Sequence, residues 1–194
     1  MNEQSSRLPS TAELAAMTSP EQVEAVLARP DLADASVQWW AVLISVCNTG
    51  LISTESGADN GKDWGAALIA TLDKGRETGV LGLEQTLHRK LMAEAALLHY
   101  FGPSAGDPVL DPERMYTDFL DDIGMSREEL LGAHQELQRE LATRRGDAAL
   151  MPALIRLSRI KDALGSLKTI AGHLTNPALR HEAEEWAALA DRMK

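Results

Sequence analysis

A chain of 194 residues can form one domain with a sizeable core or two small ones, and 44% hydrophobic with 25% charged residues is a globular composition. Aromatic residues make up only 4%, and alanine and leucine are frequent, which favours helices over sheets. The formal net charge of −10 argues against nucleic acid and an anionic membrane as partners of the whole surface.

The charge is spread unevenly along the chain. Residues 1–138 contain 9 Lys and Arg against 22 Asp and Glu, a net −13, whereas residues 139–194 contain 10 against 7, a net +3. We expect these two parts to complement each other within the molecule. The single cysteine, Cys47, excludes an intrachain disulfide, and residues 1–10 lack the apolar stretch of a signal peptide. We therefore expect a cytoplasmic location.

The first third of the chain predicts three helices. Residues 1–10 are polar and indicate a flexible tail, followed by one α-helical domain over residues 11–194. Ser10 or Thr11 can cap a short helix, and Ser19 with Pro20 begins a second one. Residues 35–52 then carry no charge, and apolar residues surround this helix on nearly all sides. We expect it to be buried at the centre of the bundle. Its apolar stretch is too short to cross a bilayer.

Glycine, proline and capping residues divide the middle of the chain. Helices are expected over residues 62–77 and 81–101, with a break at Gly79 and a stop at Gly102. Asp111 before Pro112 begins a further helix to about residue 123, and a capping box at Ser126 begins one over 127–143. No segment has the alternating pattern of a strand.

The most regular pattern is an apolar seam in a helix over residues 149–174. Its members recur at alternating steps of three and four: Leu150, Ala153, Leu157, Ile160, Leu164, Leu167, Ala171 and Leu174. Such a seam packs along another helix. At about 39 Å it is longer than most neighbours can cover, so we expect part of it to form a homodimer. Asn176 and Pro177 begin a last helix, which completes a C-terminal helical hairpin. The prediction is an all-α, compact bundle of about six to eight helices.

Glu94 is the strongest candidate for a site residue, because it lies on the apolar stripe of its helix. A buried carboxylate must be paired, hydrogen-bonded or protonated. A structural ion pair is the simpler interpretation. The alternative is a small-molecule pocket that joins Glu94 to His99 and to the adjacent Trp39 and Trp40, for which core packing is the simpler interpretation.

Three carboxylates, those of Asp118, Asp121 and Asp122, share one helix face, an arrangement that can hold Mg²⁺. The simpler interpretation is an acidic helix end, neutralised by cations such as Arg156, Arg159, Lys161 or Lys168. His88 and His99 lie about 16 Å apart along one helix, too far to share a metal. We therefore predict no metal and no cofactor.

Function is predicted only at the level of class. The helical seam, with no catalytic, metal or nucleotide motif of comparable quality in the sequence, favours a non-enzymatic interaction or regulatory protein that acts through protein–protein contacts, with a homodimer or another protein as partner. The alternative is a small-molecule-binding or catalytic bundle with an apolar pocket near Glu94. A continuous cavity that reaches Glu94 would favour the alternative.

Overall fold

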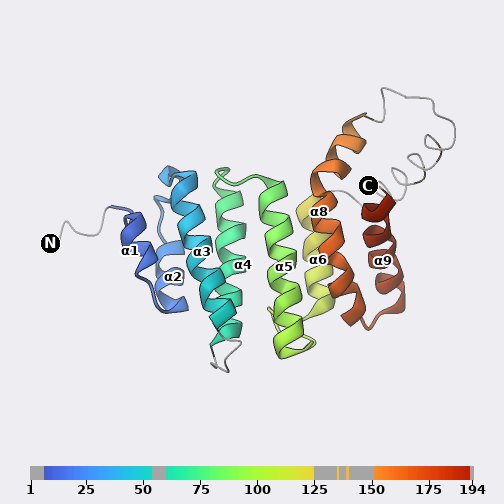
Figure 1. Ribbon diagram of the computed structural model, residues 1–194, viewed down its shortest axis with the longest axis horizontal. Coiled ribbons are helices and arrows are strands. Elements are labelled where there is room, and N and C mark those ends of the chain that lie inside the picture. The colour runs from blue at the N-terminus through green and yellow to red at the C-terminus, as the bar shows by residue number, and fades with distance from the viewer. Residues whose placement is uncertain (1–6, 54–59, 125–134, 136–138, 140–150, 193–194) are drawn as a thin grey trace. The chain divides into compact units, whose positions relative to one another are not determined.

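The computed structural model describes residues 7–53, 60–124, 135, 139 and 151–192 (Figure 1). Within these residues every regular element is a helix, which confirms the predicted all-α class. The chain divides into two compact units. Unit 1 comprises Met1–Thr86 and His99–Phe101, and unit 2 comprises Leu87–Leu98 and Gly102–Lys194. A single domain over residues 11–194 stays a prediction.

Unit 1 begins with short helices that form where the capping signals predict them. α1 (Thr11–Ala15) starts in a capping box, in which Ser10 Oγ accepts from the Glu13 N–H at 3.2 Å. α2 (Pro20–Leu27) has its proline in the first turn, and a 3₁₀ turn, η2 (Leu32–Asp34), follows. The indole N–H of Trp39 donates to the Pro9 carbonyl at 2.8 Å. Pro9 and Ser10, assigned to the tail by sequence, therefore both make hydrogen bonds in unit 1.

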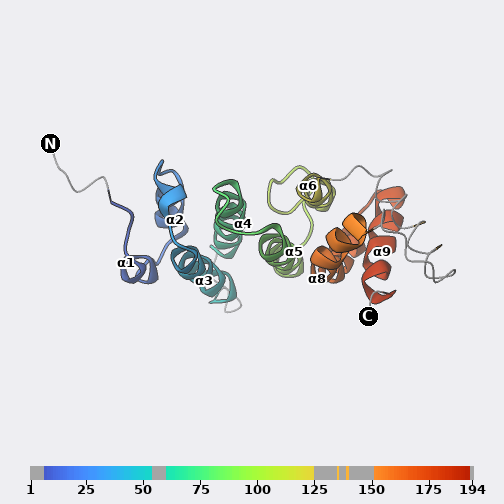
Figure 2. The ribbon, with the colours of Figure 1, turned by 90° about the horizontal axis from the view of Figure 1, so that it is seen from above.

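The rest of unit 1 is a pair of longer helices, α3 (Val37–Ser53) and α4 (Gly61–Glu77), which pack side by side (Figures 1 and 2). α3 also contacts α1 and α2. Its inner side is fully buried at Trp40, Leu43 and Cys47. Its outer side is not, because Val37 is 59% and Ile52 61% exposed. The expectation of burial on nearly all sides therefore fails on one face, since three neighbouring helices cover only part of the circumference.

Gly50 sets the spacing between α3 and α4. A Cβ at this position would lie 2.2 Å from Cδ2 of the buried Trp64 ring. We expect Gly50→Ala to lower the free energy of unfolding by about 1–3 kcal/mol, because the clash outweighs the gain of about 1 kcal/mol in helix propensity. Gly165→Ala is the matched control, since a Cβ added there would meet no other atom within 4 Å and propensity alone should stabilise the variant. Thermal unfolding of both variants measures the two changes in stability. If Gly50→Ala stabilised the protein as Gly165→Ala does, the close contact between Gly50 and Trp64 would be contradicted.

Unit 2 contains the middle of α5 (Leu83–Phe101), together with α6 (Pro112–Ile123), α8 (Met151–His173) and α9 (Pro177–Arg192). α8 and α9 form the predicted C-terminal hairpin, and α6 packs against α8 (Figure 1). The helix expected over residues 127–143 falls outside the described residues, apart from two isolated positions.

The second half of the apolar seam is buried inside unit 2. Four of its members have no exposed surface: Leu164, Leu167, Ala171 and Leu174. The chain's own helices cover this half, so it is not free for a second copy. The side chains of the first half lie outside the described residues, and the homodimer stays a prediction that concerns this half alone.

Candidate functional site

A groove of about 680 Å³ opens on unit 1 between the end of α1, the second half of α3 and the start of α4. None of its described lining residues is charged. Apolar groups and hydroxyls form its surface, among them Met17, Val42, Val46, Thr49 and Trp64. Trp64 is 6% exposed and packs directly against the α3 backbone at Gly50.

The hydroxyl groups of α3 present little polarity to this groove. Thr49 Oγ1 donates to the Ser45 carbonyl at 2.9 Å, and Ser53 Oγ donates to the Thr49 carbonyl at 2.7 Å. Both donors are therefore used within the helix, a common arrangement for hydroxyls in a helix interior. The other polar side chains of the lining are those of Thr18, Ser45 and Asn60, and the rest of the described lining is apolar side chains and glycine.

The groove continues into the exposed face of α3. Every residue of this helix is uncharged, and the side chains that face water include Val37, Ala41, Ser45, Asn48 and Ile52. We call these five residues, with the groove beside them, the α3 face. A quarter of the whole chain is charged, yet this face of about 25 Å has no charge.

The structure places Trp39 and Trp40 in the core of unit 1. They are 5% and 0% exposed, and their rings meet edge to face with centroids 5.2 Å apart. This confirms the core-packing interpretation, because the N-terminal segment covers Trp39 while Trp40 faces α4 near Gly75. Neither tryptophan lines the groove.

Glu94 and His99 belong to different units. Glu94 lies in unit 2 and is 3% exposed, so its predicted burial is confirmed. His99 belongs to unit 1, is exposed, and stacks edge to face with Tyr100 at 5.2 Å. Phe101, the last residue of α5 before Gly102, is 40% exposed. A ligand site at Glu94 stays a prediction.

Glu94→Gln separates the two interpretations of this carboxylate. We expect the variant to lose about 3–5 kcal/mol of unfolding free energy, because a buried carboxylate is usually paired and removing its charge strands the partner. Chemical denaturation monitored by circular dichroism measures the loss. A neutral or stabilising effect would indicate a protonated carboxyl and favour the ligand-binding alternative.

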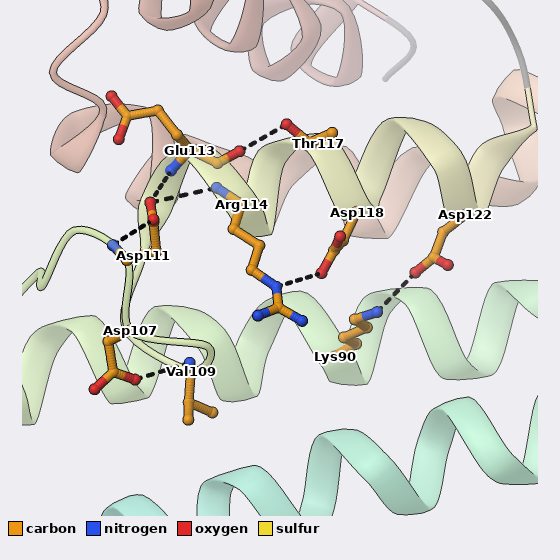
Figure 3. Close-up of polar contacts among 10 residues, drawn as sticks. Lys90, Asp107, Val109, Asp111, Glu113, Arg114, Thr117, Asp118 and Asp122 are labelled. Carbon is orange, nitrogen blue, oxygen red and sulfur yellow. Dashed lines mark hydrogen bonds and ion pairs between the residues drawn. The ribbon is translucent and has the colours of Figure 1, made fainter.

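The aspartate face of α6 is occupied by the chain's own cations (Figure 3). Asp122 pairs with Lys90 of α5 at 3.1 Å, and the two side chains are 9% and 8% exposed. Asp118 pairs with Arg114 at 3.7 Å on the surface. Sequence reasoning placed the neutralising cation on the seam helix and missed Lys90. Its signal was its position, three residues after Leu87 and one before Leu91, on the apolar stripe of α5.

Glu113 joins α6 to the turn between α8 and α9. Its Oε1 accepts from the Thr175 hydroxyl and from the backbone N–H groups of Thr175 and Asn176, both at 3.1 Å. Asn176 in turn caps α9 through its side-chain oxygen. The Thr175 hydroxyl and then the Asn176 N–H lower the pKa of Glu113 below its ordinary value.

This lowered pKa makes the contribution of Glu113 depend on pH. The stabilisation is complete above the unfolded-chain pKa of about 4.3 and is lost as the pH falls through the lower, folded value. We expect Glu113→Gln to cost about 1 kcal/mol at pH 7, a small figure because the group is in contact with water. Thermal unfolding of both proteins should show this gap at pH 7 and a smaller one at pH 3. An equal gap at both values would contradict the role of the charge.

Cys47 packs in the core of unit 1. Burial raises the pKa of its thiol to about 11, so the thiol is protonated at neutral pH. Its sulfur lies 3.7 Å from Thr71 Oγ1. A buried, protonated thiol of this kind acts as a small packing residue.

Comparison with known protein families, with curated proteins and with solved structures finds no match to this chain. Across the described ranges, no helix is long and apolar enough to span a membrane. In the same ranges, no group of three or more His, Cys, Asp or Glu side chains is placed to hold a metal ion.

Proposed function

We propose that this protein is a non-enzymatic interaction module, and that unit 1 binds a partner polypeptide through the α3 face. The observation that carries the proposal is an exposed helix face without a single charge, continuous with an uncharged groove. The centres of protein–protein interfaces are depleted of charged residues in this way. A cytoplasmic location is part of this proposal.

The geometry of the groove favours a polypeptide over a small molecule as the occupant. A volume of about 680 Å³ is within the range of ligand pockets, but those pockets enclose most of the ligand. This groove lies along α3 and continues into an exposed face, where a linear segment gains contact over its whole length. The apolar residues Val37 and Ile52 lie near the two ends of that face.

Site-specific photo-crosslinking tests this function in cells that produce the protein. A photoreactive benzoylphenylalanine replaces Asn48, which is exposed on the α3 face and does not line the groove, so the added bulk leaves the groove open. The matched control carries the same group at Ala70, which is also exposed. Ala70 lies six residues after Trp64, about 240° around α4 from the groove.

We expect light to join a discrete protein to position 48 and not to position 70. A full chain that forms no adduct at position 48 under these conditions would contradict the proposed function. Equal adducts at both positions would also contradict it, because they would show contact without a preferred face.

A further inference from the structure

The charges that border the α3 face define the chemistry of its partner. Residues 1–86 contain twelve Asp and Glu against five Lys and Arg, a net −7. Of these residues, none between Ala35 and Thr54 is charged. The acidic residues of this part of the chain therefore all lie outside α3.

Exposed acidic residues are close in sequence to the lining residues of the groove, on both α1–α2 and α4. On one side, exposed Glu13 precedes the lining residue Ala15, and exposed Glu21 follows the lining residue Thr18. On the other side, exposed Asp63 lies between the lining residues Asn60 and Trp64. The neighbouring cation, Lys62, is half-buried.

Two of these carboxylates are held in their charged form. The backbone N–H of Ser10 donates to Glu13 at 2.6 Å, and this bond and the Ser10 hydroxyl lower the pKa of Glu13. The Ser19 hydroxyl lowers the pKa of Glu21. The negative border is thus maintained well below neutral pH.

We infer that the occupant of the α3 face is one amphipathic helix of another protein, with apolar residues along one edge and lysines or arginines on both flanks. This inference rests on the proposed function. A helix with apolar residues at steps of three and four matches an uncharged groove along another helix. Basic flanks match the carboxylates at its border.

The same charges disfavour the other occupants. A second copy of the chain has a net charge of −10 and an anionic lipid surface is also negative, so the negative charge of unit 1 disfavours both at the α3 face. An acidic amphipathic helix would place like charges together at both sides of the groove. A helix with basic flanks would instead be attracted to the negative charge of unit 1.

Two fluorescent peptides test the inference by anisotropy with the full chain. Both have about 18 residues, long enough to span α3, with leucines at helical spacing and alanines between them. One carries lysines on its flanks and the other glutamates. We expect the lysine peptide to bind at least about tenfold more tightly, and the difference to shrink as salt is added. Equal affinities would overturn the inference.

Neutral variants separate the groove from general attraction to an acidic protein. Ser45→Phe fills the groove and Ala70→Phe adds the same bulk elsewhere, so neither changes the charge. We expect Ser45→Phe to weaken the lysine peptide at least about tenfold and Ala70→Phe to leave it unchanged. Ile52→Ser is a second variant, because shortening a side chain that is 61% exposed leaves the fold intact and should weaken binding several-fold. Unchanged binding in both Ser45→Phe and Ile52→Ser would overturn the inference.

The peptide experiment and the cross-linking experiment test the inference and the proposed function separately. If neither peptide binds while position 48 still captures a protein in cells, this inference is overturned and the proposed function stands. If position 48 captures nothing, the proposed function is contradicted whatever the peptides do.

Discussion

Asp122→Asn should be among the most damaging conservative substitutions in unit 2. It removes the negative charge from an ion pair in which Asp122 and Lys90 are only 9% and 8% exposed (Figure 3). Breaking a buried ion pair by removing one of its charges costs about 3–5 kcal/mol. For a chain of this size, that corresponds to a melting temperature about 6–20 °C lower. Differential scanning calorimetry at pH 7 measures it.

Asp118→Asn is the matched control, since Asp118 lies one turn earlier on α6. Its partner Arg114 is 3.7 Å away, and the two side chains are 43% and 56% exposed. Exposed pairs contribute about 0–1 kcal/mol, so we expect little change. The double variant Lys90→Met with Asp122→Leu replaces both charges of the pair by apolar groups and should be more stable than Asp122→Asn. Similar losses in Asp118→Asn and Asp122→Asn would show that burial is not the cause.

Leu164→Ala should produce the largest loss among the described seam residues. Leu164 has no exposed surface and lies on α8, which packs against both α9 and α6. Truncating a buried leucine costs about 2–5 kcal/mol, which is about 4–20 °C in melting temperature here. Calorimetry or circular dichroism on heating measures the shift.

Lys168→Ala on the same helix provides the comparison, because Lys168 faces water. A change at an exposed position of this kind is usually within about 0.5 kcal/mol. A melting curve of Leu164→Ala that coincides with that of Lys168→Ala would show that the seam does not support the fold.

The helices of this protein were predictable because their ends are signalled locally. Pro112 after Asp111 marks the start of α6, and Asp111 Oδ1 indeed accepts from the Glu113 N–H at 3.1 Å. The expected helix over 62–77 differs from α4 by one residue at its start. Capping and proline signals act within a few residues, so a single sequence contains them.

What the sequence did not predict depends on which elements meet. Lys90 and Asp122 are 32 residues apart, and no local pattern pairs α5 with α6. Sequence reasoning instead chose cations of the helix that carries the apolar seam. In the same way, periodicity identified α3 as apolar all round, but not that its Val37 and Ile52 side would lack a covering helix. The candidate groove was therefore not foreseen, and the residues chosen by sequence, Glu94 among them, do not line it.

The positions of the four tryptophans give each unit its own optical signal. Trp39, Trp40 and Trp64 lie in unit 1, whereas Trp186 is the tryptophan of unit 2. All four are at most 6% exposed, so each should shift its emission to longer wavelength when its surroundings unfold. Fluorescence is thus weighted towards unit 1, while far-ultraviolet circular dichroism reports the helices of both units. Unfolding curves that coincide for the two probes indicate one cooperative transition. Curves that separate indicate that the two units unfold independently.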